Sequence, residues 1–284
     1  MSEKSVCVIT GGGSGMGLAA AKFMPKEKVI VLSGRTVQKL EGAVSQLREF
    51  GFEAYSYACD VSDRQSVRRL AEYAASLGKI TNVIHAAGMS PAMAKPEQLL
   101  RTNALGTMYV NQEFSSKMKK SSVIVDIASN SAYVLPKILI SEKVYRLAET
   151  EEEKFIKKCV KKSNLVKKEY EKSGFAYSLS KNFAVWYAKK SAFDLGVRGI
   201  RVVSLSPGLI DTDMGQLESR EGGSMLRYGA EERMGKAEEL GYAIATLADK
   251  RNGYLAGVDI LCDGGCTTGK YFKKDRHKRK EGEK

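Results

Sequence analysis

The stretch that decides the fold is Val6-Cys7-Val8-Ile9-Thr10-Gly11-Gly12-Gly13-Ser14-Gly15-Met16-Gly17, close to the N-terminus. Its first four residues are apolar, which favours a short buried strand of a parallel sheet. The glycines that follow allow a sharp turn and a close approach of the backbone to a ligand. A helix is expected directly after them, with its free N–H groups turned toward a bound phosphate. A strand, a glycine-rich turn and a helix in this order are typical of a nucleotide-binding α/β fold.

Strands and helices alternate along almost the whole chain. Apolar runs predict strands at residues 6–9, 29–32, 54–58, 82–85, 123–127, 201–205 and 258–261. Helical patterns lie at 17–23, 37–50, 66–77, 102–118, 177–194 and 237–248. Such alternation predicts right-handed crossovers and a Rossmann-like, doubly wound parallel sheet of the α/β class. Because 284 residues with 43% hydrophobic content can bury one large core, we expect a single domain over residues 1–269.

One segment, residues 137–172, departs from this alternation. It is highly charged, and its apolar residues recur at helical spacing, which predicts two or three short helices inserted into the domain. The apolar stripes consist of Val144, Leu147 and Ala148, followed by Phe155, Ile156, Cys159 and Val160. We expect these stripes to pack the insertion on the body of the protein.

The net charge of +13 is concentrated in two places. Residues 270–284 contribute +5 and residues 137–172 contribute +4. The basic residues therefore lie in a tail, expected to be disordered, and in the inserted helices, and not in a groove interleaved with aromatic residues. This distribution argues against nucleic-acid binding. A basic tail that docks on an acidic partner is the alternative interpretation.

Other features of the composition favour a cytoplasmic protein. No apolar run approaches the length of a membrane span. The N-terminus passes directly into the first strand, without a secretory leader. The five cysteines are scattered, which favours reduced thiols. Cys262 and Cys266 have no histidine close in sequence, so no metal site is expected.

A second informative stretch is Tyr177-Ser178-Leu179-Ser180-Lys181. On a helix, Tyr177 and Lys181 lie one turn apart and share a face. A tyrosine ordinarily loses its proton only near about pH 10, so a neighbouring ammonium would favour the phenolate. Together the two stretches resemble the short-chain dehydrogenase/reductase family, whose motifs are Thr-Gly-x-x-x-Gly-x-Gly and Tyr-x-x-x-Lys. The resemblance implies an enzyme that transfers a hydride between a nicotinamide cofactor and a ketone or secondary alcohol.

The same resemblance implies a catalytic set. Tyr177 would exchange a proton with the substrate oxygen, Lys181 would assist it and hold the nicotinamide ribose, and Ser129 would bind the oxygen. Asn103 would hold a water in a proton relay. Ser131 is a less favoured substitute for Ser129.

The resemblance also implies where the cofactor binds. The expected cofactor-binding residues are Gly11, Gly13, Ser14, Gly15, Met16, Gly17, Arg35, Asp60, Val61, Ala86, Ala87, Gly88, Tyr177, Lys181, Pro207, Gly208, Ile210 and Thr212. Relatives that use NAD usually carry an acidic residue after the second strand, whereas this chain has Ser33-Gly34-Arg35 there. Because an arginine suits a 2′-phosphate, we expect NADP(H), with NAD(H) possible. His85 stands where the family usually has asparagine, and we interpret it as structural.

Ser129 and Tyr177 are 48 residues apart, further than in most relatives, and the insertion accounts for the excess. An insertion at this point is similar to the bacterial 3α-hydroxysteroid dehydrogenase/carbonyl reductase branch, which implies a hydroxysteroid or bile-acid substrate and an oligomer. Since the insertion ends near Ser129 and Tyr177, we expect it to wall the substrate cleft as a lid. The alternatives are a general carbonyl reductase of quinones or small ketones, and a non-catalytic dinucleotide-binding regulator.

Overall fold

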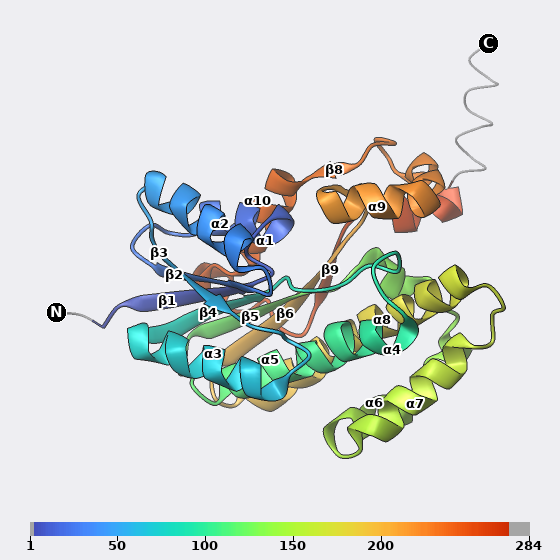
Figure 1. The fold of residues 1–284 in the computed structure, drawn as a ribbon, viewed down its shortest axis with the longest axis horizontal. Coiled ribbons are helices and arrows are strands. Elements are labelled where there is room, and N and C mark those ends of the chain that lie inside the picture. The colour runs from blue at the N-terminus through green and yellow to red at the C-terminus, as the bar shows by residue number, and fades with distance from the viewer. Residues whose placement is uncertain (1–2, 273–284) are drawn as a thin grey trace, which may run out of the picture.

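The computed structural model describes residues 3–272 and contains a seven-stranded parallel sheet (Figure 1). The strand order is β3-β2-β1-β4-β5-β6-β9. The strands are β1 (Ser5–Thr10), β2 (Val29–Gly34), β3 (Glu53–Ala58), β4 (Lys79–His85), β5 (Ser122–Ile127), β6 (Ile200–Pro207) and β9 (Asp259–Cys262). All seven predicted strands are present, and the expected doubly wound α/β fold is confirmed. The order reverses beside β1, so the carboxyl ends of β1 and β4 flank the crevice where such sheets bind ligands.

Helices cover both faces of the sheet (Figure 1). On one face lie α1 (Gly15–Lys22), α2 (Val37–Glu49) and α10 (Ala237–Leu247), whose apolar residues share a core with Ile9, Ile30 and Val125. The other face carries α3 (Arg64–Leu77), α4 (Pro96–Leu100), α5 (Gly106–Ser115) and α8 (Glu169–Gly196). Their apolar residues pack with Val8, Val31 and other side chains of that face. Burial on both faces explains why the strands are almost continuously apolar.

Two predicted helices differ from those observed. The pattern at 102–118 corresponds to α5 and to the π-helical turn before it, η1 (Arg101–Leu105), which contains Asn103 and joins α4 to α5. The helix expected from residue 177 begins at Glu169, because the insertion runs directly into it. Tyr177 and Lys181 therefore lie in the interior of a long helix and not in its first turn.

The insertion folds into short helices beside α8 (Figure 1). They are η3 (Lys137–Leu139), α6 (Glu142–Tyr145), η4 (Arg146–Glu149) and α7 (Glu152–Ser163). The ring of Phe155 lies 5.1 Å from that of Phe183 on α8, and Tyr145 lies 5.3 Å from the same ring. The apolar stripes are thus buried in the main core, as expected.

Several elements were not predicted. After β6 the chain forms β7 (Ile210–Asp211), α9 (Asp213–Gly222), η5 (Gly223–Tyr228) and β8 (Gly235–Lys236), and β7 pairs with β8 in a small separate sheet. Short 3-10 turns also occur at η2 (Asn130–Tyr133) and η6 (Lys250–Asn252). Helix α9 is polar on average and contains few bulky apolar residues, Met214 and Leu217, so no apolar run marks it in the sequence.

None of the described helices is long and apolar enough to cross a bilayer. Of the basic tail expected at 270–284, residues 273–284 lie outside the described part of the chain.

Candidate active site

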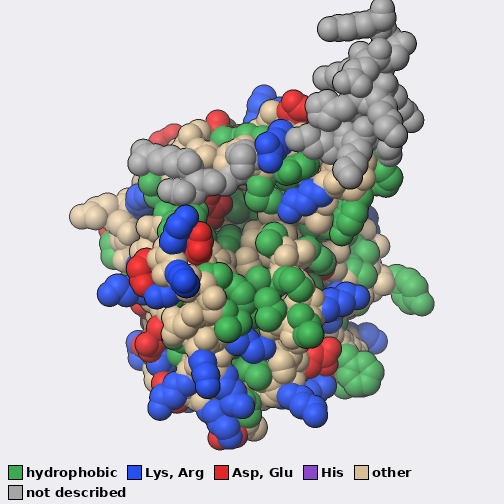
Figure 2. Space-filling view, turned by 90° about the vertical axis from the view of Figure 1, so that its right-hand side faces the viewer, with side chains coloured by type: hydrophobic (Ala, Val, Ile, Leu, Met, Phe, Trp, Pro, Cys, Tyr) green, Lys and Arg blue, Asp and Glu red, His purple; other side chains and the backbone are tan. Residues whose placement is uncertain are grey.

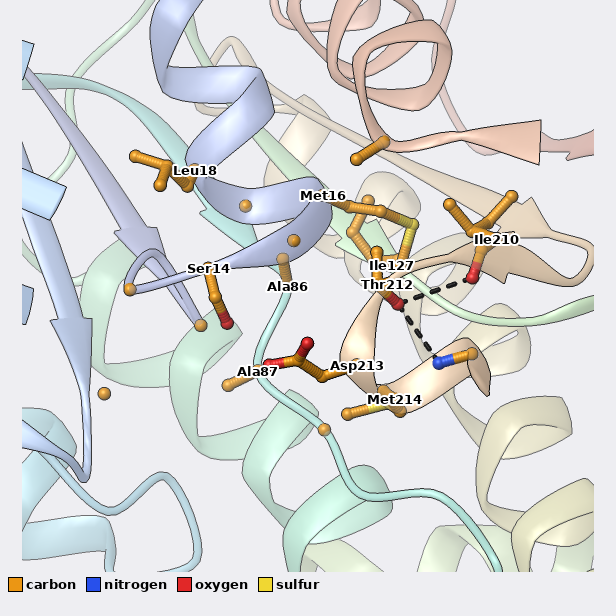
Figure 3. A pocket seen from close by; sticks show the side chains of 18 of the residues that line it. Ser14, Met16, Leu18, Ala86, Ala87, Ile127, Ile210, Thr212, Asp213 and Met214 are labelled. Atoms are coloured by element: carbon orange, nitrogen blue, oxygen red, sulfur yellow. Dashed lines mark hydrogen bonds between the residues drawn. The ribbon is translucent and has the colours of Figure 1, made fainter. Parts of the chain in front are cut away.

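A cavity of about 510 Å³ lies at the carboxyl ends of β1, β4, β5 and β6. Figure 3 shows Met16 of α1, Ile127 of β5 and Ile210 of β7 gathering around it with Thr212. In Figure 2 a hollow is visible in the upper half of the face, with hydrophobic side chains along part of its rim. The cavity contains every expected cofactor-binding residue: Gly11, Gly13, Ser14, Gly15, Met16, Gly17, Arg35, Asp60, Val61, Ala86, Ala87, Gly88, Tyr177, Lys181, Pro207, Gly208, Ile210 and Thr212. Ser129 also lines it.

The glycine turn between β1 and α1 forms one wall. Gly11 has a φ of +68°, and a Cβ there would lie 2.7 Å from the carbonyl carbon of Ala86. A Cβ on Gly17 would lie 2.5 Å from the Gly11 oxygen. Only glycine fits these two positions, so the backbone can approach a ligand closely and α1 can begin at the cavity with its N–H groups. This cradle fits a dinucleotide pyrophosphate.

Two basic side chains stand where the cavity passes the end of β2. Arg35 and Lys39 both line it, and both are exposed. The Nζ of Lys39 lies 3.6 Å from an Asp213 oxygen, whereas Arg35 forms no ion pair with any residue from 3 to 272. The described residues of β2 and its following turn offer no carboxylate to a ribose. This end of the cavity therefore fits an anionic group.

Asn103 does not line the cavity itself but lies directly behind Gly88, which does. Its Oδ1 accepts a hydrogen bond from the Met89 N–H at 2.8 Å, and its Nδ2 donates to the Met89 oxygen at 2.9 Å. A Cβ on Gly88 would meet Asn103 Oδ1 at 3.2 Å and Lys181 Nζ at 3.4 Å. The π-helical turn thus brings Asn103 beside Lys181, with its side chain held by the backbone of residue 89. π-Helical turns often occur at functional sites.

The Tyr177 hydroxyl is flanked by Ser129, Ser131 and Glu218. Burial raises the pKa of Tyr177 above its ordinary value, and the charge of Glu218 raises it further, while the two serine hydroxyls act to lower it. From the sequence, Lys181 was expected to favour the phenolate and so to lower the pKa of Tyr177. In the protein without a bound cofactor, the pKa of Tyr177 is raised instead. Burial disfavours the phenolate more than these neighbours favour it. Ser131, the less favoured serine, lies at the phenol together with Ser129.

Lys181 is buried below the tyrosine. Its Nζ donates a hydrogen bond to the Ile127 oxygen at 2.9 Å and lies 5.9 Å from the centre of the Tyr177 ring. Burial lowers the pKa of Lys181 to about 8, and the charges of Glu218 and Asp126 oppose this shift. The ammonium therefore depends on nearby carboxylates to remain charged.

Two buried side chains lie at the ends of the neighbouring strands β4 and β5. His85 Nδ1 lies 2.8 Å from the Thr10 hydroxyl, and burial together with Lys181 lowers the pKa of His85 to about 3. A neutral, fully buried ring agrees with its structural interpretation. Asp126 is fully buried beside Asn111, and burial raises the pKa of Asp126 to about 7. A carboxylate inside the apolar run 123–127 was the sequence signal for Asp126, which the prediction missed.

Glu218 was also missed. It lies on α9, lines the cavity, and flanks both Tyr177 and Lys181. Thr212 caps this helix by accepting a hydrogen bond from the Gly215 N–H at 3.1 Å (Figure 3). No local pattern could place Glu218, because its role depends on how α9 folds back over the cavity.

The expectation that the insertion forms a lid is wrong for this structure. No described residue from 137 to 172 lines the cavity. Its apolar stripes pack on α8 and α4, away from the strand ends. The side of the cavity next to Tyr177 is instead formed by α9, through Met214, Gly215 and Glu218.

Comparison with known proteins gives a consistent result over nearly the whole chain. Residues 5–140 match the family model described as short chain dehydrogenase, and residues 144–267 match the model described as Enoyl-(Acyl carrier protein) reductase. The short-chain dehydrogenase/reductase bsc3 of Alternaria brassicicola is 28% identical, with 97% of this chain and 99% of that protein covered.

Two further relatives have named substrates. A 7alpha-hydroxysteroid dehydrogenase of Escherichia coli (strain K12) is 24% identical, over 91% of this chain and 92% of that protein. A D-threitol dehydrogenase of Mycolicibacterium smegmatis is 26% identical, over 93% of this chain and 94% of that protein. Among solved structures, a short chain dehydrogenase from Burkholderia cenocepacia J2315 in complex with NADP superposes with a TM-score of 0.73 at 20% identity, covering 92% of this chain and 96% of that one.

Proposed function

Because this chain belongs to the short-chain dehydrogenase/reductase family and is an NAD(P)-dependent enzyme that acts on CH–OH groups, we propose that it interconverts a ketone and a secondary alcohol with NADP(H). The observation that carries the proposal is the convergence of Ser129, Tyr177 and Lys181 on the cavity that begins at the glycine turn. The bound nicotinamide would supply or accept the hydride.

Residues of the chain would bind the cofactor, hold the substrate oxygen and transfer the proton. The N–H groups at the glycine turn would bind the pyrophosphate, and Arg35 would bind the 2′-phosphate. Ser129 would hold the substrate oxygen by a hydrogen bond. Tyr177 would donate its proton to that oxygen in reduction and accept it in oxidation. Lys181 would bind the ribose hydroxyls and stabilise the phenolate, and Asn103 would position the water that exchanges the proton with solvent.

The substrate class is proposed from the named relatives and from the lining of the cavity. A hydroxysteroid or bile acid is supported by the relative named a 7alpha-hydroxysteroid dehydrogenase, whereas the 3α branch has no named counterpart among the three relatives above. The insertion gives no support to a steroid cleft, because it does not line the cavity. A carbonyl reductase of quinones or small ketones is the second candidate, favoured by the polar Glu218 beside Tyr177.

We also propose a cytoplasmic homo-oligomer. Free cysteines support the compartment, since none of Cys7, Cys59, Cys159, Cys262 and Cys266 is paired. Two exposed apolar side chains near the end of α8 support an interface: Phe193 is 84% exposed and Val197 is 90% exposed.

The proposal is tested by following NADPH and NADH absorbance with a panel of steroids, bile acids, quinones and small ketones. Wild-type protein should turn over at least one class, and Tyr177→Phe should lose about a hundredfold or more of the rate while binding NADPH normally. Lys181→Ala should impair both rate and cofactor binding. If Tyr177→Phe keeps more than about a tenth of the wild-type rate, the tyrosine is not the proton donor. A wild type that binds NADPH but turns over no compound would favour the non-catalytic regulator.

A further inference from the structure

One carboxyl group in the cavity has no role in the reaction described above. Glu218 comes from α9 and reaches the wall that contains Tyr177 and Lys181. Its Oε1 is buried and has no hydrogen-bond partner within the described chain. Buried polar atoms are almost always paired, so an unpaired carboxyl oxygen in a ligand cavity indicates a missing partner.

The Tyr177 hydroxyl interacts with the same carboxyl group, but Oε1 itself has no partner among the described residues. Lys181 is only 7% exposed, and its ammonium already donates a hydrogen bond to the Ile127 oxygen at 2.9 Å. The Ser129 hydroxyl accepts a hydrogen bond from the Ser131 N–H at 3.2 Å and interacts with the Tyr177 hydroxyl. Burial raises the pKa of Glu218, and the nearby Lys181 and Tyr177 only partly oppose this. The carboxyl thus remains under-solvated and can accept a further hydrogen bond.

The position of Glu218 restricts what the missing partner can be. Because the reacting oxygen would bind at the Tyr177 hydroxyl, a substrate group that meets Glu218 beside this phenol lies close to the reacting carbon. A second cation there would be repelled by Lys181, which disfavours an ammonium. A hydroxyl can donate to the carboxyl without that repulsion. A purely apolar neighbour, such as the ring carbon of a steroid, would leave the carboxyl buried without a partner.

We propose that Glu218 is a specificity-determining residue that accepts a hydrogen bond from a hydroxyl next to the reacting carbon, so that the preferred substrates are α-hydroxyketones and vicinal diols. This inference rests on the proposed function and specifies its substrate class. The relative named D-threitol dehydrogenase acts, by its name, on a compound that contains vicinal hydroxyls.

The test uses two ketones that differ by one hydroxyl, butan-2-one and 3-hydroxybutan-2-one, reduced with NADPH by the full chain. The wild type should favour the hydroxyketone in kcat/KM by about tenfold or more, because a site built to bind a hydroxyl rejects the analogue that lacks it. Glu218→Leu should bring the ratio of the two kcat/KM values close to one, because any effect of the substitution on the pKa values of Tyr177 and Lys181 acts on both ketones alike. Glu218→Gln keeps an acceptor oxygen and should restore part of the preference.

Controls separate this inference from its premise. Leu217→Ala changes a neighbouring α9 residue that does not line the cavity, and it should leave both ketones unaffected. Unchanged NADPH binding by Glu218→Leu shows that the site is folded. Equal losses for the two ketones, no preference in the wild type, or no rescue by glutamine would overturn the role of Glu218. A wild type that reduces neither ketone but accepts other compounds also overturns it, whereas one that turns over nothing at all overturns the proposed function.

Discussion

The Tyr177 hydroxyl lies in surroundings that hold its proton. Burial and Glu218 raise the pKa of Tyr177, and Lys181 itself has a pKa lowered to about 8. A phenol that stays protonated at neutral pH is suited to donate a proton during ketone reduction. Oxidation of an alcohol needs the phenolate, and the positive charge of the oxidised nicotinamide would favour it. At this scale, the state of the cofactor is expected to set the protonation of the tyrosine.

We expect the choice between NADP(H) and NAD(H) to depend on Arg35. It is exposed, lines the cavity, and has no ion-pair partner within residues 3–272. A charge-assisted hydrogen bond to a 2′-phosphate contributes about 1.5–3 kcal/mol, so Arg35→Ala should raise the KM for NADPH by about ten- to a hundredfold. The KM for NADH should change little. Steady-state kinetics with both cofactors measure this, and an equal loss with both would show that Arg35 does not bind the phosphate.

At the scale of elements, α8 joins the insertion to the active site. One of its faces carries Tyr177 and Lys181 toward the cavity, and another carries Phe183 and Trp186 toward the inserted helices. The insertion therefore packs against the side of α8 that faces away from the cavity. It can affect activity through the stability of α8, although none of its described residues lines the cavity.

Phe155→Ala tests this supporting role. Phe155 is fully buried between Tyr145 and Phe183, so the substitution should lower the free energy of unfolding by about 3–5 kcal/mol. The KM values for large and small ketones should remain unchanged. Ile138→Ala, at an 89% exposed position of the same segment, is the control and should change stability by less than about 0.5 kcal/mol. Denaturant unfolding and kinetics measure the two effects. A rise in the KM for steroids alone, with normal stability, would restore the lid interpretation.

At the scale of the whole molecule, the buried Asp126 links stability to pH. Its pKa is about 7 in the folded protein against an ordinary value of 3.8, so the folded state binds the proton more tightly. The favourable contribution is complete below about pH 4 and is lost as the pH rises through 7. The lost part is at most about 4 kcal/mol, at about 1.4 kcal/mol for each of roughly three pKa units.

Asp126→Asn should remove this loss. Its new amide can pair with the Asn111 Oδ1, which is buried without a partner in the wild type. The variant should be more stable than the wild type at pH 8, and the difference should shrink toward pH 4. Denaturant unfolding at both pH values measures it, with Glu41→Gln on exposed α2 surface as a control that should change little. A variant that is less stable at pH 8 would show that the Asp126 carboxylate is stabilised by its surroundings.

Local patterns in the sequence were sufficient for the strands, for most of the helices, and for the glycine turn. Apolar runs and glycines act over a few residues, and the order of strands in a doubly wound sheet follows from its right-handed crossovers. The resemblance to a known family then gave the residues that line the cavity, from Gly11 to Thr212.

Only the tertiary structure decided which groups surround the Tyr177 hydroxyl and Lys181. Glu218 meets Tyr177 across 41 residues of sequence, and Asp126 meets Lys181 across 55. The apolar stripes of the insertion showed that it must pack, but they did not show whether it would cover the cavity or α8. Such contacts depend on the relative placement of whole elements, and burial at these contacts sets the pKa values of the site. A pattern of neighbouring residues contains no information on the placement of elements or on these pKa values. Both arise only when segments that are distant in the sequence come together and exclude water from the space between them.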